Sequence, residues 1–180
     1  MNQFTSNFWK RLATVFLIVG FLGLSGCASG SNVSASSKVV IHAFDINGWY
    51  DNPAWAKQAD LLAYSYGDQY HMVRRAVKPG EQTLGYSSGV SGPMPVGEFL
   101  YVKWRIKATG EELEDKVDLR NRLPANMFEH KVTFVIDGKQ LYVYLVTPQT
   151  KSTGTPPFLK TRLSDYYVTH EIYPNNTYKK

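Results

Sequence analysis

The chain has 180 residues, a formal net charge of +5 and one cysteine, with 20 basic and 15 acidic residues. Nucleic-acid-binding proteins gather their basic residues on one face, whereas here these residues are scattered along the chain, so that class is excluded. A single cysteine also excludes a disulfide bond within the chain.

The first 26 residues are typical of a secretory signal peptide. Lys10 and Arg11 form a short basic region, and residues 12–24 form an apolar stretch shorter than the roughly 20 residues that span a bilayer. The signal ends at Leu24-Ser25-Gly26-Cys27, which resembles the lipobox of bacterial lipoproteins. This resemblance implies cleavage before Cys27 and covalent acylation of Cys27, and we expect no other cofactor.

Cys27 and the small polar residues after it, 27–37, are predicted to form a lipidated, flexible tether. Ala28 and Ser29 stand where an aspartate usually retains such lipoproteins in the inner membrane. The lipobox resemblance therefore implies an outer-membrane anchor with the folded part in the periplasm. Two of the basic residues and no acidic residue leave with the signal, so the mature charge is +3. Residues 38–180 are predicted to be one globular domain, long enough to enclose a core.

The first half of the domain contains one clear strand and one ambiguous segment. Residues 38–46 are rich in β-branched and aromatic residues and end at the turn dipeptide Asn47-Gly48, which predicts a strand. In residues 58–80 the tyrosines and valines favour strands. Residues 55–63 are also compatible with a short helix.

Residues 85–89 read GYSSG and match the G-x-S-x-G pattern of a hydrolase nucleophile elbow. Such an elbow needs a helix after the serine, but Pro93 and Pro95 follow at once and prevent one. We therefore expect a Gly/Ser loop and no enzymatic activity. The four histidines are far apart and match no zinc-binding spacing, so no metal site is expected.

The second half of the domain has the clearest strand patterns. Residues 98–106 alternate apolar and polar side chains, which is typical of a half-buried strand. Residues 131–146 form two alternating runs around Asp137-Gly138, which predicts a hairpin with a type I′ turn. Residues 166–173 are predicted to be the last strand. The expected fold is mainly β, antiparallel and β-sandwich-like, with one or two short helices.

Two groups of side chains are candidates for binding a partner. The first is acidic and lies within residues 110–118, interpreted either as a solvated turn or as a partner-facing patch: Glu111, Glu112, Glu114 and Asp115. The second group is aromatic. Tyr142 and Tyr144 alternate with apolar residues, and Tyr101 is on the same side of its predicted strand as two basic residues. This parity predicts a tyrosine-rich outer sheet face, a composition favoured in protein interfaces. Packing beneath a covering loop is the alternative for any one of these tyrosines.

Four segments of the mature chain, taken in order, resemble a family of small bacterial lipoproteins. They read FDINGWY (44–50), LYVKWRI (100–106), VDLRNRLPANM (117–127) and VTFVIDGKQLYVYLVTP (132–148). The chain is similar to the immunity lipoproteins encoded beside phospholipase effectors of the type VI secretion system.

This resemblance implies a periplasmic lipoprotein that binds and neutralises a cognate lipase effector, with the membrane contacted through the lipid. Such a binder needs a rigid surface rather than catalytic residues. The alternative is a structural envelope lipoprotein that anchors a secretion or envelope complex through a loop or a strand edge. Both expectations name a protein as the partner, and neither involves nucleic acid.

Overall fold

In the computed structural model, the described residues are 38–46, 57–68, 73–85, 88–151 and 160–180. All of them belong to one compact unit, Ser36–Lys180. The signal peptide, Cys27, the tether, Asn47-Gly48, His71 and Ser87 lie outside the described residues, so the structure does not address the predictions made for them.

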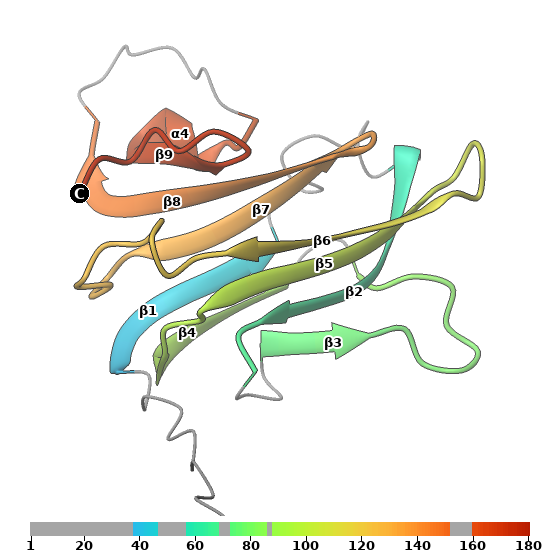
Figure 1. Ribbon diagram of the computed structural model, residues 1–180, viewed down its shortest axis with the longest axis horizontal. Helices are drawn as coiled ribbons and strands as arrows, with labels where there is room; N and C mark the ends of the chain where they lie inside the picture. The colour runs from blue at the N-terminus through green and yellow to red at the C-terminus, as the bar shows by residue number, and fades with distance from the viewer. Residues whose placement is uncertain (1–37, 47–56, 69–72, 86–87, 152–159) are drawn as a thin grey trace, which may run out of the picture. The chain divides into compact units, whose positions relative to one another are not determined.

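The described residues form two β-sheets (Figure 1). The five-stranded sheet has the order β4 (Ser88–Pro95), β1 (Val39–Ile46), β7 (Lys131–Asp137), β8 (Gln140–Thr150) and β9 (Tyr167–Tyr173). The four-stranded sheet has the order β3 (Arg74–Ala76), β2 (Ala59–Tyr66), β5 (Phe99–Ile106) and β6 (Glu112–Asp118). A single turn of helix, α4 (Leu163–Tyr166), precedes β9.

This architecture confirms the predicted mainly β, sandwich-like fold. Neighbouring strands are antiparallel except β1 and β7, which pair in parallel. Parallel neighbours need a long connection. The chain between β1 and β7 is long enough for this connection, because it contains β2 to β6. One of these strands, β4, is the other neighbour of β1 in the sheet.

The core lies between the two sheets and contains a cluster of four aromatic rings. Phe44 on β1 stacks on Tyr66 of β2, with ring centroids 4.9 Å apart and an interplanar angle of 9°. Tyr64 and Phe134 complete the cluster at 5.9 and 6.1 Å from Phe44. Since Tyr64 and Tyr66 come from one sheet and the two phenylalanines from the other, this cluster joins the sheets.

The helical alternative for residues 55–63 is wrong over 59–63, because β2 begins at Ala59. The register of β2 against β5 shifts between Leu61 and Ala63, and this irregularity buries Leu61 and Leu62 in succession. The extra residue interrupts the two-residue alternation of the strand. The resulting spacing of apolar residues resembles that of a helix face, which explains the ambiguity in the sequence.

The hairpin of β7 and β8 is confirmed, but its turn lies one residue later than predicted. Asp137 pairs with Gln140, so the two central residues of the turn are Gly138 and Lys139. Gly138 has a φ of +59°, whereas Lys139 is not among the residues with positive φ. The predicted type I′ turn is therefore wrong, since that turn needs positive φ at both central positions. Asp137 stays in the strand, and Lys160 Nζ contacts its carboxylate at 2.6 Å.

Replacing Gly138 by valine is expected to lower the free energy of unfolding by about 1–3 kcal/mol, because a β-branched residue resists positive φ. A new Cβ at this position meets no atom within 4 Å, so the loss is expected from the backbone rather than from a clash at Cβ. Gly138→Asn is the matched control and should cost less, since asparagine occurs at positive φ more often than a β-branched residue does. Urea unfolding of both variants checks this, and equal stabilities would contradict the turn geometry.

His42 is a buried, neutral histidine. It is 1% exposed, its Nδ1 lies 2.8 Å from the carbonyl oxygen of Val40, and its Nε2 lies 3.1 Å from the Tyr66 hydroxyl. A carbonyl oxygen only accepts, so Nδ1 carries the proton and Nε2 accepts from Tyr66. Burial lowers the pKa of His42 from its usual 6.5.

Stability is therefore expected to fall as the pH falls below about 6.5, because the unfolded chain then binds a proton that folded His42 resists. Above that pH His42 is neutral in both states and the effect vanishes. His42→Asn should flatten the slope of the urea midpoint against pH. A residual slope is expected from His170, whose pKa is also lowered by burial. An unchanged slope in the variant would mean that His42 is not the group that resists protonation.

Candidate interaction face

The outer side of the four-stranded sheet carries an ordered set of polar and aromatic side chains. Along β5 the buried residues are Leu100, Val102 and Trp104, which confirms the predicted alternation. The outward residues of β5 and β6, which we call the β5–β6 face, are Phe99, Tyr101, Lys103, Arg105, Glu112, Glu114, Lys116 and Asp118.

The prediction that the acidic stretch is a solvated turn is wrong from residue 112 onward, because Glu112–Asp118 form the edge strand β6. Leu113 and Val117 turn toward the sandwich, so the stretch alternates like a strand despite its acidity. Glu111 remains in the turn, where Lys139 Nζ lies 2.7 Å from its carboxylate. Asp115 accepts a hydrogen bond from the Tyr173 hydroxyl at 2.5 Å and therefore does not belong to the outward row.

Contacts on the β5–β6 face join residues that lie directly opposite or diagonally across the two strands. The Glu112 carboxylate lies 2.8 Å from Lys103 Nζ and 3.1 Å from Arg105 Nη2. Hydrogen bonds from Lys103 and Arg105 lower the pKa of Glu112. Exposed ion pairs of this kind add little stability, so their main effect is to restrict the long side chains to one geometry.

Tyr101 lies at the centre of this face and is fixed by β6. Its hydroxyl donates to Glu114 Oε2 at 2.6 Å, and this hydrogen bond, together with some burial, raises the pKa of Tyr101 to about 12. Its ring borders a shallow depression of about 370 Å³ whose other walls include Ser65, Arg74 and Ala76. A tyrosine held in this way offers contact area to a partner with little rotamer entropy to lose.

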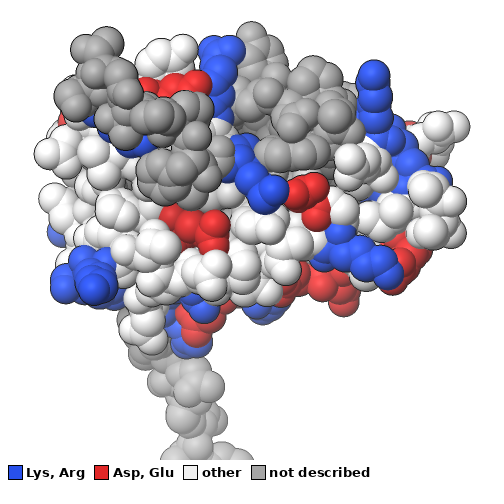
Figure 2. Space-filling view, turned by 90° about the horizontal axis from the view of Figure 1, so that it is seen from above, with Lys and Arg blue, Asp and Glu red and all other residues white. Residues whose placement is uncertain are grey.

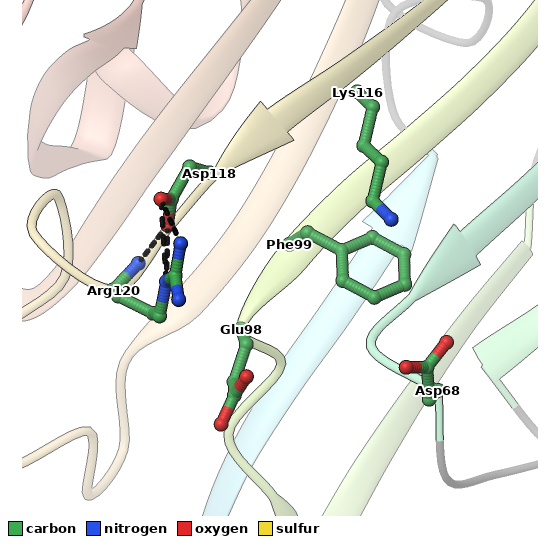
Figure 3. Close-up of a pocket in the computed structure, with 6 residues that line it drawn as sticks. All are labelled: Asp68, Glu98, Phe99, Lys116, Asp118 and Arg120. Atoms are coloured by element: carbon green, nitrogen blue, oxygen red, sulfur yellow. Dashed lines mark hydrogen bonds and ion pairs between the residues drawn. The ribbon is translucent and has the colours of Figure 1, made fainter.

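A second depression, of about 350 Å³, lies at the end of the face where β6 finishes (Figure 3). Lys116 Nζ sits 4.0 Å from the centroid of the Phe99 ring. The Arg120 guanidinium donates hydrogen bonds to the Asp118 carboxylate from Nη2 at 2.6 Å and from Nε at 3.0 Å. These hydrogen bonds lower the pKa of Asp118 to about 2. The depression thus combines an aromatic ring with charged side chains of both signs.

The lining of this second depression is completed by Asp68 and Glu98. Sequence reasoning places Phe99 on the same strand face as Tyr101, but it does not name Phe99, Lys116 or Glu98 as a candidate for partner binding. The signal that could have found them is the charge alternation from residue 112 to 118, read as a strand opposite residues 99–105. Figure 2 shows positive and negative side chains intermixed on the view from above, with no area dominated by one sign.

The predicted exposure of Tyr144 is wrong, since this residue is 0% exposed. It lies on the outer side of β8, but the segment after residue 160 covers it: Lys160 N–H donates to its hydroxyl at 3.4 Å. Thr161 and Ser164 of the same segment are also buried. Tyr142 stacks beside Tyr144 at 6.5 Å and is half-buried beneath the Lys160 ammonium. The alternative of packing under a covering segment therefore holds for Tyr144.

The remaining chemical candidates from the sequence are the GYSSG segment and the histidines. Ser88, directly after the elbow serine position, begins strand β4, so no helix follows GYSSG. Within the described residues, His42 lies on β1, His130 directly precedes β7 and His170 lies on β9, and no group of three or more potential ligands converges on a metal position. No helix in the described part of the chain has the length and apolarity needed to cross a membrane.

Comparison with protein-family models, curated proteins and solved structures finds no match to this chain.

Proposed function

We propose that the chain is a lipid-anchored periplasmic protein that binds a cognate lipase effector of a type VI secretion system and neutralises it by steric occlusion. The proposal combines the family resemblance of the sequence with one structural observation. That observation is the β5–β6 face, where Tyr101 is held by Glu114 among paired charges. A protein inhibitor needs such a rigid surface rather than a reactive group.

The test is to express the lipase effector that this proposal expects beside the gene of this chain, in the periplasm of a sensitive strain, with and without the full-length lipoprotein. Protection of the cells and recovery of a stable complex by affinity purification are expected. If cells carrying the lipoprotein die as readily as those without it and no complex forms, the proposal is wrong. Recovery of envelope-complex components instead of the lipase would favour the structural lipoprotein.

The binding face can be tested with two matched tyrosines. Tyr101→Ala is expected to weaken the complex roughly tenfold or more if Tyr101 is an anchor of the interface. Tyr166→Ala is the control, because Tyr166 is 58% exposed on α4, far in the sequence from the β5–β6 face. Isothermal titration of both variants measures the difference. Equal affinities would place the interface elsewhere.

A further inference from the structure

Three exposed large hydrophobic side chains, Val39, Ile41 and Phe128, lie near the point where the chain enters the domain, whereas Tyr166 and Tyr167 are exposed separately at α4 and the start of β9. Of the described residues, Val39 is 57% exposed, Ile41 51% and Phe128 48%. Val39 and Ile41 lie on the outer side of β1, because the alternate residues Phe44 and Ile46 point into the core. Pro95 and Pro93 of β4 stand opposite them in register and extend the apolar surface.

Phe128 is held beside this strand by a tight turn. Its N–H donates to Asn126 Oδ1 at 3.0 Å, and its carbonyl oxygen accepts from His130 Nδ1 at 2.8 Å. Glu129 adopts a φ of +58°, uncommon for a residue other than glycine, and its N–H donates to the Ile41 carbonyl at 2.9 Å. The turn therefore places the backbone of Phe128 one residue from the position that pairs with Ile41, and it does so with a strained backbone at Glu129.

The position of this patch in the chain indicates what covers it. Cys27, the residue that the lipobox marks for acylation, precedes Val39 by a polar stretch whose reach is at most about 40 Å. A tether of this length keeps the domain at high local concentration next to the bilayer, so a modest apolar surface is enough for docking. Lys38 precedes Val39 and Glu129 follows Phe128 in the chain, so the formal charges next to the apolar residues cancel.

We propose that Val39, Ile41 and Phe128 form a membrane-docking patch that rests on the phospholipid surface holding the anchor. Exposed apolar side chains of this kind insert into the boundary between headgroups and acyl chains. The inference rests on the lipid anchor of the proposed function and not on the identity of the effector. It also orients the protein: the patch and the β5–β6 face lie on the outer sides of different sheets, so the β5–β6 face turns away from the bilayer toward the periplasm.

The experiment uses the full-length lipoprotein, purified in detergent and reconstituted into vesicles of phosphatidylethanolamine with a minority of phosphatidylglycerol. Because Cys27 is the only cysteine, its acylation leaves an engineered cysteine as the single free thiol. Ile41→Cys carries an environment-sensitive fluorophore on the patch. Ala76→Cys is the control, since Ala76 is exposed on β3 of the other sheet.

The fluorophore at position 41 is expected to shift to the blue and brighten several-fold in vesicles, and lipids carrying a quencher should dim it. The fluorophore at position 76 should show neither change, and high salt should not reverse the effect at position 41. Adding Phe128→Asn to Ile41→Cys should reduce the shift without lowering the melting temperature, because the Phe128 side chain is half-exposed.

Two failures can be told apart. If the protein without an engineered cysteine takes up the thiol label, Cys27 is not acylated and the anchor itself is wrong. If Cys27 resists the label and the protein floats with the vesicles, but positions 41 and 76 report the same aqueous environment, the anchor stands and the docking patch is wrong.

Discussion

Replacing Phe44 by alanine is expected to lower the free energy of unfolding by about 3–5 kcal/mol, the usual cost of removing a buried phenylalanine. Phe44 is 2% exposed and stacks on Tyr66 from the opposite sheet. The lost ring leaves a cavity that the surrounding aromatic side chains cannot fill, because strands fix their positions on both sides. Urea unfolding followed by tryptophan fluorescence measures the loss.

Val39→Ala in the same strand is the matched control, since Val39 is 57% exposed. Its replacement should change stability by no more than about 0.5 kcal/mol. Comparable losses in the two variants would show that the sheets do not depend on the Phe44 cluster for their packing.

Gly97→Ala is the second substitution with a large expected effect. A Cβ at Gly97 would lie 2.6 Å from Cδ2 and 2.7 Å from Cε2 of Tyr66, well inside van der Waals contact. The Tyr66 ring has no free direction to move, because Phe44 stacks on it and His42 lies within hydrogen-bonding distance of its hydroxyl. Overpacking of this kind costs about 1–3 kcal/mol and sometimes more.

Gly85→Ala is the control for Gly97→Ala, because a Cβ at Gly85 meets no atom within 4 Å and should be tolerated. A double-mutant cycle identifies the clashing partner. In a Tyr66→Leu background the cost of Gly97→Ala should be much smaller, since the smaller side chain frees the space. If Gly97→Ala costs the same in both backgrounds, Tyr66 is not the residue that excludes a larger side chain.

Strands that have one buried face and one solvent-exposed face were predictable from the sequence. In β5 the apolar residues at 100, 102 and 104 follow the two-residue period of a strand, and all three are buried. The β7–β8 hairpin was equally clear, but its turn was assigned one residue early. The position of a turn depends on pairing, and Asp137 pairs with Gln140 rather than forming part of the turn.

Local sequence patterns gave wrong predictions where a segment distant in the sequence determines the environment of a side chain. Tyr144 alternates with buried residues and was predicted to face solvent, but a segment beginning 16 residues later covers it. Periodicity assigns a side chain to one side of a strand and carries no information about what lies over that side. The prediction for the acidic stretch after Glu111 failed for a related reason: Glu112 pairs with Lys103 and Arg105 of β5, and composition alone does not reveal that strand as a partner.

The place of β1 in its sheet determines the order in which the domain can fold. Its neighbours β4 and β7 both follow it in the chain, and β2 and β3, which come next, belong to the other sheet. A polypeptide that emerges with its N-terminus first must therefore leave β1 unpaired until β4 appears, and the parallel pairing must wait until β7 appears. Such distant pairings are slow to close, so we expect the local hairpins β5–β6 and β7–β8 to form early. The strand nearest the tether is then completed late, after most of the chain has emerged.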